Sequence, residues 1–368
     1  MRILILNWRD PKNPKSGGAE QVTMSHAKAW VKNGNSVTWF TSQFTGGSEM
    51  EEISGVSIIR SGRVPGVYFR AFLFYLKHRE EFDIVIDEIH GIPFFTPLYV
   101  RKPKIAFIHE VAIEIWDYMY PFPLNILGKI IERFYFIFYK SILFWTDAPS
   151  TIKDLEAFGI SATNCTAIAC PISNKPLTNL PKKEAVPTFL FVSRIVKMKG
   201  IEDVIAAFGL IAKKQPKAQL WIIGNGEAGY VHSLKTLVRK KGLSKHVLFL
   251  GRLVEKEKLN RMQRAHLLLH ASVREGWGLV VLEAASQGTP SVVYNVSGLC
   301  DTVKNAETGV IVSQNTPEEL AKETEKLLSD NKRYVRLQKN GLAWVKSFSW
   351  KEAGRQSTKL LQDTIKSV

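Results

Sequence analysis

The fold of this chain is decided by the stretch FLFVSRIVKMKG, residues 189–200, together with the residues that follow it. Its first four residues form an apolar run that is typical of a buried parallel strand, and the rest form a loop that carries cations. A helical pattern over Ile201–Lys214 comes next, and a second apolar run, Leu220–Ile223, follows that helix. A strand, a loop, a helix and another strand in this order predict a βαβ unit of a parallel sheet.

The same alternation extends outward through most of the chain. Short apolar runs recur on both sides of this unit, and helical patterns such as Glu20–Lys32 separate them. The alternation predicts an α/β fold with two Rossmann-like, doubly wound domains. The other runs predicted as strands are Arg2–Leu6, Ser36–Phe40, Asp83–Ile86, Ile105–Ile108, Val247–Leu250, Leu267–His270 and Ser291–Val293.

The length of 368 residues exceeds that of a single usual core and suggests two domains. The segment from Cys170 to Pro187 is rich in proline and lysine and shows no periodicity, which is typical of a linker. We therefore predict a first domain at residues 1–170 and a second at 187–349, with a helix at 350–368 that packs back on the first. Because doubly wound sheets bind ligands at the carboxyl ends of their strands, the two domains are expected to face each other across a cleft.

The composition is that of an ordinary soluble protein, with 45% hydrophobic and 23% charged residues. No segment approaches the roughly 20 apolar residues that a membrane helix needs. The run at Arg2–Leu6 is too short for a signal peptide, so a cytoplasmic location is expected. The three cysteines, Cys165, Cys170 and Cys300, include no Cys-x-x-Cys pair, which argues against a disulfide framework or a zinc site.

The chain carries a net charge of +16, which suggests an anionic partner such as nucleic acid, an anionic membrane or a phosphorylated ligand. General solubility is the alternative explanation. No nucleic-acid-binding module is recognised and the basic residues are dispersed, so a nucleic-acid partner is not expected.

Two glycines, Gly17 and Gly18, lie between the first predicted strand and the first predicted helix. Free amides and the helix dipole attract anions at such a turn, although most Gly-Gly turns bind nothing. The turn has neither the Gly-x-Gly-x-x-Gly nor the P-loop spacing, which disfavours an NAD-dependent oxidoreductase or an ATP-hydrolysing enzyme. In the second domain, Arg194 and Lys199 can neutralise a diphosphate without a metal, or they can be solvated loop charges.

The most informative segment is EGWGLVVLEAASQGTP, residues 275–290. A loop carboxylate, Glu275, precedes a helix that is predicted to begin near Gly278 and to end at Gly288. A second carboxylate, Glu283, lies in an otherwise apolar run of that helix, and a buried carboxylate is costly unless it is hydrogen-bonded. We expect a ribose diol to satisfy Glu283 and sugar hydroxyls to satisfy Glu275, with a structural carboxylate as the alternative.

These segments resemble the retaining group 1 glycosyltransferases of family 4, which have the GT-B fold of two Rossmann-like domains. The likeness rests on Ser16–Glu20, Arg194–Gly200, Gly224–Gly226 and Glu275–Pro290, the last of which is close to the Glu-x7-Glu signature of that family. Order and spacing agree over nearly the whole chain, and the C-terminal pattern at residues 348–350 agrees as well.

The resemblance implies a role for each matching residue. Arg194 and Lys199 bind the diphosphate of a nucleotide sugar. Glu275 holds hydroxyls of the donor sugar, and Glu283 holds the ribose. His109, at the end of a predicted strand, matches a histidine that lies near the reacting sugar in many members; a satisfied loop histidine is the alternative. The implied catalytic residues are His109, Arg194, Lys199 and Glu275. The implied donor-binding residues are Gly17, Gly18, Arg194, Lys199, Gly224, Arg252, Leu253, Glu275, Gly276, Trp277, Gly278, Leu279 and Glu283.

Two segments depart from the family pattern. Residues 170–173 replace the usual Asn-Gly-Val/Ile-Asp, which leaves the hinge contacts open, and Gly298-Leu299 replaces a Gly-Gly pair in one sugar-contacting loop. The chain has no Asp-x-Asp, by which another glycosyltransferase fold holds a divalent metal, so no metal or other cofactor is expected. The resemblance implies front-face attack at an oxocarbenium-like centre, with the diphosphate oxygen helping to take the proton of the acceptor.

Two further segments, residues 67–79 and 126–144, combine aromatic or apolar bulk with cations on one helical face. Such helices can lie at an anionic bilayer surface, or they can pack in the core with a solvated basic side. If these helices lie at a bilayer surface, the hypothesis that follows is a lipid-linked acceptor. The cations are Arg70 and Lys77 in the first segment, and Lys129, Arg133 and Lys140 in the second.

The sequence thus predicts an enzyme that moves a hexose-type sugar from a UDP- or GDP-linked donor to a lipid-linked or cell-surface glycan precursor. A cytoplasmic protein, peripheral on the inner face of the cell membrane, is expected. The alternatives are another nucleotide-sugar enzyme of the same fold, such as an epimerase or a phosphorylase, and a basic nucleic-acid-binding protein. A glycogen-type phosphorylase needs a pyridoxal lysine and a far longer chain.

Overall fold

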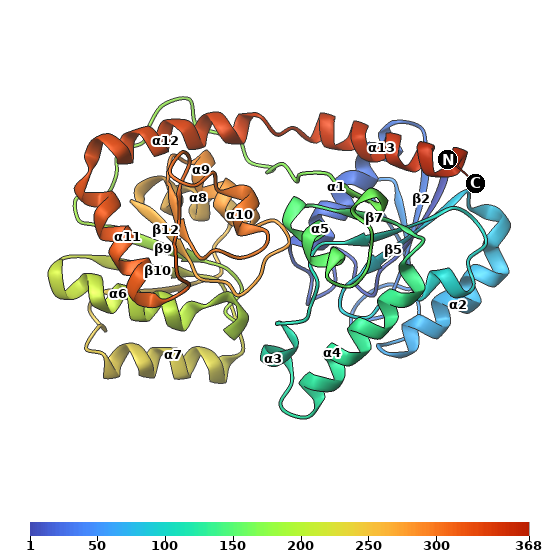
Figure 1. Ribbon diagram of the computed structural model, residues 1–368, viewed down its shortest axis with the longest axis horizontal. Helices are drawn as coiled ribbons and strands as arrows, with labels where there is room; N and C mark the ends of the chain where they lie inside the picture. The colour runs from blue at the N-terminus through green and yellow to red at the C-terminus, as the bar shows by residue number, and fades with distance from the viewer. Residues whose placement is uncertain (368) are drawn as a thin grey trace. The chain divides into compact units, whose positions relative to one another are not determined.

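The computed structural model describes residues 1–367 and divides the chain into two compact units (Figure 1). The first unit comprises Met1–Cys170 and the chain from Ser349 onward, and the second comprises Pro171–Phe348. Each unit is built on one mainly parallel sheet, with apolar clusters on both of its faces. The predicted doubly wound α/β architecture is therefore present twice.

The first unit contains an eight-stranded sheet in the order β3-β4-β2-β1-β5-β6-β7-β8, which is parallel except for the pair of β3 and β4. The order reverses between β1 and β5, and such a point is where doubly wound sheets bind ligands. The strands are β1 (Arg2–Leu6), β2 (Ser36–Thr41), β3 (Met50–Ile53), β4 (Val56–Arg60), β5 (Ile84–Ile89), β6 (Lys104–Ile108), β7 (Leu143–Thr146) and β8 (Cys165–Ala167). The helices are α1 (Gly18–Lys32), α2 (Gly66–His78), α3 (Trp116–Met119), α4 (Leu124–Tyr135), α5 (Pro149–Glu156) and α13 (Trp350–Lys366).

The second unit contains a six-stranded parallel sheet in the order β11-β10-β9-β12-β13-β14. Its order reverses between β9 and β12, so the loops after these two strands occupy the ligand-binding position of the fold. The strands are β9 (Thr188–Val192), β10 (Gln219–Ile223), β11 (Val247–Gly251), β12 (Leu267–His270), β13 (Ser291–Val293) and β14 (Val310–Ile311). The helices are α6 (Ile201–Lys214), α7 (Ala228–Lys240), α8 (Glu255–Arg264), α9 (Leu279–Ser286), α10 (Leu299–Thr302), α11 (Pro317–Ser329) and α12 (Asn331–Lys346).

Every run that the sequence predicts as a strand is a strand, with ends that agree within a few residues. The prediction of a continuous amphipathic helix over residues 126–144 is wrong in its last part. Helix α4 ends at Tyr135, a 3-10 turn covers Phe136–Tyr139, and β7 begins at Leu143. Phe136, Tyr139 and Phe144 of this last part are buried, and β7 pairs with β6 on one side and β8 on the other.

The proline- and lysine-rich segment at residues 171–187 belongs to the second unit. Asn174 Nδ2 donates a hydrogen bond of 2.7 Å to Ser286 Oγ, and the backbone N–H of Leu177 donates one of 2.9 Å to the carbonyl of Ser286. The second unit therefore begins at Pro171 and not at residue 187, because this segment is bound to the end of α9 despite its linker composition.

Helix α13 packs along α1 within the first unit (Figure 1). Ser357 is fully buried at this contact, and its Oγ accepts a hydrogen bond of 3.0 Å from Trp30 Nε1. His26 Nδ1 lies 3.0 Å from the same hydroxyl. Burial lowers the pKa of His26 to about 4, so the ring is neutral and can accept the hydroxyl hydrogen. Gly354 completes the close approach, because a Cβ there would lie 2.6 Å from Ala29 Cβ.

We expect Ser357→Ala to lower the free energy of unfolding of the first unit by about 1–3 kcal/mol, because two buried ring nitrogens lose their partner. Urea unfolding followed by tryptophan fluorescence measures this change. Lys351→Ala on the exposed side of the same helix is the control and should change stability by less than about 0.5 kcal/mol. Equal stability of the two variants would contradict the assigned hydrogen bonds.

Candidate active site

Charged side chains gather at the carboxyl ends of the neighbouring strands β9 and β12 in the second unit. The loop after β9 carries Arg194, which is exposed, and Lys199, which is buried in a short 3-10 turn before α6. Strand β12 ends at His270, and the loop after it carries Glu275. Because the two strands are adjacent and parallel, both loops leave the same edge of the sheet.

Lys199 and Glu275 form an ion pair, with 2.7 Å between Nζ and Oε1. His270 Nε2 lies 2.9 Å from the same carboxylate oxygen. Burial opposes the ionisation of Glu275, but the Lys199 ammonium and the His270 ring outweigh burial and hold the pKa of this carboxyl well below its usual range. Glu275 is therefore ionised at neutral pH. Lys199 and Glu275, which the sequence selected separately, contact each other.

The backbone of Glu275 is fixed by the loop that precedes α10. Its N–H donates a hydrogen bond of 3.2 Å to the carbonyl of Ser297. Gly298 has a φ of +81°, and a Cβ at this position would lie 2.2 Å from the carbonyl oxygen of Glu275. A residue with a side chain would thus be both strained and in collision there. The single glycine of the Gly298-Leu299 pair is sufficient to allow this close approach.

Helix α9 begins after Gly278 and carries Glu283 more than one turn further along. Glu283 Oε2 lies 2.9 Å from Lys258 Nζ of α8, and Lys258 also pairs with Glu255 at 2.9 Å. Burial raises the pKa of Glu283, although Lys258 opposes the shift. Lys258 thus supplies the partner that the sequence assigned to a ribose. The Glu283 side chain remains 23% exposed, which leaves room for a second contact.

The turn after β10 brings two backbones close together. The Gly224 N–H donates a hydrogen bond of 2.8 Å to the carbonyl of Gly251, and a Cβ on Gly224 would lie 1.8 Å from the carbonyl oxygen of Ser193. Residues 224–229 have the Gly-x-Gly-x-x-Gly spacing that is absent from the turn after β1. Gly224, the first glycine of this pattern, allows the close packing against the loop that carries Arg194.

The other residues of the second unit that are predicted to bind a donor lie at the same edge of its sheet. Arg252 is exposed after β11, and the neighbouring Leu253 packs against the apolar cluster that contains Trp221. Trp277 is buried, and its ring meets Phe348 edge-on at 5.8 Å between centroids. The residues that lead into α9 beside Trp277 are Gly276, Gly278 and Leu279.

In the first unit, the Gly17–Gly18 turn is tied to a buried carboxylate. The Gly17 N–H donates a hydrogen bond of 2.6 Å to Glu20 Oε2, and Arg9 Nε lies 2.7 Å from Glu20 Oε1. Glu20 is fully buried, and the ion pair with Arg9 and the hydrogen bond from Gly17 offset the cost of burying its charge. The amide of Gly17, which the sequence offered to an anionic ligand, is therefore engaged within the protein.

His109 follows β6 and is buried between two carboxylates. Its Nδ1 is hydrogen-bonded to Asp147 Oδ2, and its Nε2 lies 3.2 Å from Glu88 Oε1. Burial disfavours the charged ring, but the two carboxylates outweigh burial and raise the pKa of His109 to about 10. Because both nitrogens then donate hydrogen bonds, the ring has no lone pair for a proton. In this state His109 is a fixed cation and not a general base.

Within residues 1–367, one group of side chains has the spacing of metal ligands, namely Glu88, His90 and His109, with ligand atoms within 4.8 Å of one another. His90 Nε2 lies 3.0 Å from Glu88 Oε1, and its Nδ1 lies 3.3 Å from Arg9 Nη2. Because a guanidinium can only donate, Nδ1 accepts and Nε2 carries the hydrogen. The side-chain atoms that could bind a metal are thus hydrogen-bonded to one another, and the positive charge of the adjacent Arg9 opposes the binding of a cation.

The cations predicted for a membrane-facing surface differ in their surroundings. Arg70 and Lys77 are exposed on α2, and Arg133 is exposed on α4. Lys129 is half-buried and forms an ion pair of 2.6 Å with Asp117. Lys140, after α4, is exposed as well, so four of the five predicted cations are open to solvent, whereas Lys129 connects α4 to α3.

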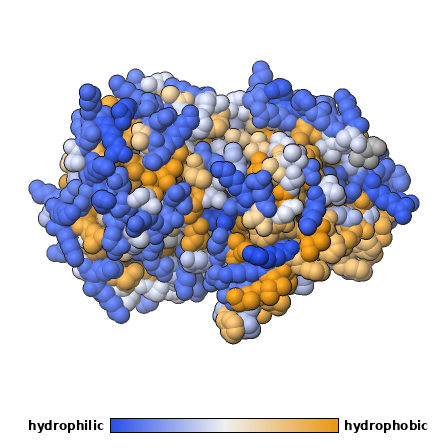
Figure 2. Space-filling model, viewed as in Figure 1, coloured by the Kyte–Doolittle hydropathy of each residue, from blue (hydrophilic) through white to orange (hydrophobic). Residues whose placement is uncertain are grey.

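Helix α4 turns its apolar side outward. It buries Gly128, Glu132 and Tyr135, and the Glu132 carboxylate accepts hydrogen bonds from Ala112 N at 2.6 Å and Trp116 Nε1 at 2.9 Å. The alternative of a core helix with a basic outer side is therefore wrong for α4. We call the outward surface the α4 face, and Figure 2 shows apolar surface gathered at its place at the lower edge. Its exposed residues are Tyr118, Met119, Tyr120, Phe122, Leu124, Ile126, Leu127, Ile130, Ile131, Phe134 and Ile137.

An exposed apolar surface of this extent indicates an interaction site. It lies on a short amphipathic helix and not on a spanning one, because no helix within residues 1–367 is long and apolar enough to cross a membrane.

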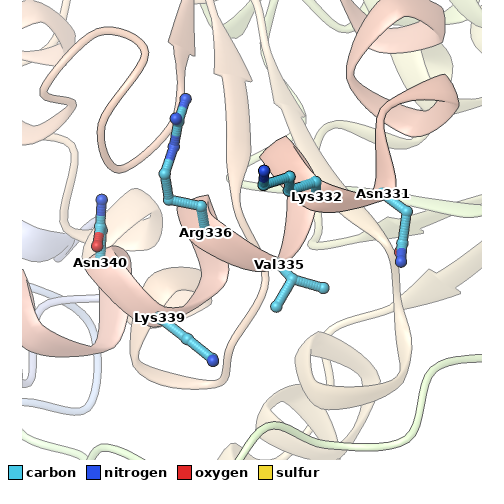
Figure 3. Close-up of a pocket in the computed structure, with 6 residues that line it drawn as sticks. All are labelled: Asn331, Lys332, Val335, Arg336, Lys339 and Asn340. Atoms are coloured by element: carbon cyan, nitrogen blue, oxygen red, sulfur yellow. The ribbon is translucent and has the colours of Figure 1, made fainter.

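A shallow hollow on the second unit runs along one side of α12 (Figure 3). Figure 3 shows Arg336 and Lys339 pointing to different sides of the helix, so their charges do not converge on one point. Since no predicted site residue lies on α12, we assign no ligand to this hollow. Its lining residues are Asn331, Lys332, Val335, Arg336, Lys339 and Asn340.

The sequence did not predict His270 beside Glu275, nor Glu88 and Asp147 beside His109. Each lies at or near the carboxyl end of a strand. A polar residue at the end of a buried parallel strand is the signal that could have identified His270 and Glu88. Asp147 follows β7, whose first two residues fall within the helix predicted at residues 126–144.

Comparisons with known proteins define first the fold and then the family. The structure matches sucrose-phosphate synthase of Thermosynechococcus elongatus with a TM-score of 0.82 over 100% of both chains, at 20% sequence identity. The fold is thus that of the GT-B enzymes. The family described as "Glycosyl transferases group 1" matches residues 177–344. An uncharacterized glycosyltransferase of Methanocaldococcus jannaschii is 35% identical over 359 residues, which cover 90% of each chain. This chain belongs to the group 1 glycosyltransferases.

A shorter match covers about half of the chain. A D-inositol 3-phosphate glycosyltransferase of Corynebacterium aurimucosum is 29% identical over 179 residues, which are 48% of this chain and 42% of that protein. The chain therefore matches less than half of the length of this relative.

We expect the charge of His109 to stabilise the first unit in a pH-dependent way. Its pKa is raised from 6.5 to about 10 on folding, so its contribution is fully present below pH 6.5 and is lost as the pH rises through about 10. Urea unfolding of the wild type and of His109→Asn across this range measures the difference, with the exposed His232→Asn as the control. A difference between wild type and His109→Asn that is constant from pH 6 to 10 would contradict the charged ring.

Proposed function

We propose that this protein is a retaining glycosyltransferase that moves a hexose from a UDP- or GDP-linked sugar to an acceptor. The observation that carries the proposal is the pair of Lys199 and Glu275 beside the exposed guanidinium of Arg194, at the carboxyl ends of β9 and β12. A diphosphate offers anionic oxygens to the two cations, and a sugar offers hydroxyls to the carboxylate. Two adjacent loops thus meet both chemical demands of a nucleotide diphospho-sugar.

Arg194 and Lys199 are proposed to stabilise the departing diphosphate in place of a divalent metal. The backbone of Lys199 is held in a short turn, so its ammonium group is kept close to the site before the reaction begins. A preorganised donor at a developing negative charge contributes roughly 3–4 kcal/mol in comparable sites. Two such cations are enough to carry the charge of a leaving nucleoside diphosphate without a metal cofactor.

The rest of the donor is assigned to the neighbouring loops. Lys258 bonds to one carboxylate oxygen of Glu283, and the other oxygen, Oε1, is the one that we assign to the ribose. The turn at Gly224 and the residues Arg252 and Leu253 are proposed to border the base. The amides that open α9 at Gly278 are proposed to face the sugar or the phosphate, where the helix dipole favours negative charge.

The proposed reaction is a front-face displacement. The acceptor oxygen forms its bond to the anomeric carbon on the side from which the diphosphate oxygen departs, and that oxygen takes the acceptor proton. The anomeric centre passes through an oxocarbenium-like state, and the configuration is retained. Glu275 holds sugar hydroxyls and does not donate a proton, since its low pKa keeps it ionised.

We expect Lys199→Ala to lower turnover about 10²–10³-fold, because a cation that stabilises the leaving group is lost. A thermal-shift screen with UDP, GDP, ADP and their common sugars identifies the donor, and the same assay shows whether the variant still folds. Lys197→Ala is the matched control, since Lys197 is exposed in the same turn. Turnover of Lys199→Ala at the wild-type rate would remove Lys199 from the site, and a wild type that no nucleotide stabilises would overturn the proposal.

We also propose that the first unit binds a lipid-linked acceptor while the protein lies peripherally on the cytoplasmic side of an anionic membrane. The support is the α4 face, where apolar side chains point outward and Arg133 is exposed beside them. Arg70 and Lys77 add exposed cations on α2. An interfacial helix combines apolar burial with basic residues, and each cation near an anionic surface contributes about 1 kcal/mol.

Replacing Ile130 and Phe134 together by serine should abolish most binding to vesicles of phosphatidylcholine and phosphatidylglycerol, because these side chains are 58% and 62% exposed on the α4 face. Co-sedimentation at low salt measures the bound fraction. Met50→Ser, which removes an apolar side chain that is 72% exposed on β3, is the control and should bind like the wild type. A wild type that binds no anionic vesicle at low salt sinks the membrane proposal.

A further inference from the structure

His270 has one hydrogen-bond partner among the residues that the structure describes, and that partner is Glu275. The ring is fully buried at the end of β12, where Nε2 lies 2.9 Å from Glu275 Oε1. Its other nitrogen, Nδ1, is buried and accepts no hydrogen bond within residues 1–367. A carboxylate can only accept, so Nε2 carries the hydrogen and donates it to Glu275. Burying this ring is costly, and its hydrogen bond to Glu275 is the one polar contact that offsets the cost among the described residues.

The Glu275 carboxylate receives both of its hydrogen bonds on a single oxygen. Lys199 Nζ at 2.7 Å and His270 Nε2 at 2.9 Å both end on Oε1. Within the described residues 1–367, no hydrogen bond ends on Oε2. Oε2 is therefore the oxygen that can accept from a hydroxyl of a ligand, and its direction is set by the two donors that hold Oε1.

Lys199 has two anionic partners, one in the structure and one in the proposed function. It pairs with Glu275 in the structure, and it is the cation assigned to the diphosphate of the donor. A lysine has a flexible stem and can turn toward a diphosphate, whereas the buried ring of His270 cannot follow it. When Lys199 turns, the carboxylate loses one of its two donors, and a largely buried carboxylate without a partner is strongly destabilised.

We infer that His270 is a positioning residue that holds Glu275 in place for the donor sugar, so that Lys199 is free to bind the diphosphate. This inference rests on the proposed function. His270 acts through Glu275 and does not touch the donor. Its loss should therefore weaken the recognition of the sugar but not that of the nucleoside diphosphate, because Lys199 and Arg194 remain.

Calorimetric titrations of the full-length protein test this inference with two substitutions. His270→Leu fills a similar volume and removes the donor, whereas His270→Gln retains an N–H at a comparable distance from the backbone. The probes are two nucleoside diphosphates, UDP and GDP, and their nucleotide sugars. The nucleotide sugars are UDP-glucose, UDP-N-acetylglucosamine, UDP-galactose and GDP-mannose. For each protein, the measured quantity is the ratio of the affinity for the nucleotide sugar to the affinity for the corresponding nucleoside diphosphate.

We expect His270→Leu to lower this ratio about tenfold or more, as the loss of a hydrogen bond to a charged group implies, with little change for UDP or GDP alone. His270→Gln should restore most of the ratio, and kcat should fall in the leucine variant in parallel with sugar affinity. Melting temperatures without ligand show whether both variants fold.

Three results would overturn the inference. In the first, His270→Leu binds the nucleotide sugar and the nucleoside diphosphate as tightly as the wild type does. In the second, it binds both more weakly by the same factor. In the third, His270→Gln folds but does not recover the affinity ratio. A wild type that binds none of the probes overturns the proposed function itself and the inference with it. If the wild type binds the probes and the ratio is unchanged in His270→Leu, the inference alone is overturned.

Discussion

Buried carboxylates at the carboxyl ends of parallel strands determine how the loops of both units are arranged. A carboxylate taken out of water is costly unless cations or hydrogen-bond donors accompany it. In the second unit Lys199 neutralises Glu275 and His270 donates a hydrogen bond to it, and in the first unit His109 neutralises Glu88. These residues come from different loops, so a shift of one loop would leave a charge unpaired. The loops at each sheet edge are consequently held together, which is the preorganisation that a binding site requires.

A buried carboxylate also explains the orientation of α4. Glu132 accepts hydrogen bonds from the backbone of Ala112 and the indole of Trp116, and this contact fixes the polar side of the helix against the protein. The apolar side is then left in solvent, which reverses the usual arrangement of an amphipathic helix at a protein surface. A local departure of this kind is expected where a surface has a function. The exposed Arg133 is consistent with an anionic partner for this face.

Much of the fold follows from the pattern of apolar runs. Strands such as β1 and β12 are buried on both faces, so nearly every residue in them is apolar, and the run itself predicts the strand. The missed strands lack this signal. Strand β3 at the sheet edge has two glutamates, and β7 is separated from the aromatic residues after α4 by a break of only two polar residues, Lys140 and Ser141. Edge position and neighbouring sequence hide such strands, because only tertiary packing distinguishes them.

The sequence by itself determined the family pattern and the two-domain α/β class, and it selected Lys199, Glu275 and Glu283 as candidate site residues, because motif spacing along a strand, loop and helix is local information. It did not determine their partners. Lys199 and Glu275 are far apart in the chain, and they meet because β9 and β12 are neighbours in the sheet. The structure alone decided that His270 shares the Glu275 carboxylate and that Lys258 satisfies Glu283. The physical reason is that the environment of a buried charge is set by side chains brought together through strand order, which no local pattern encodes.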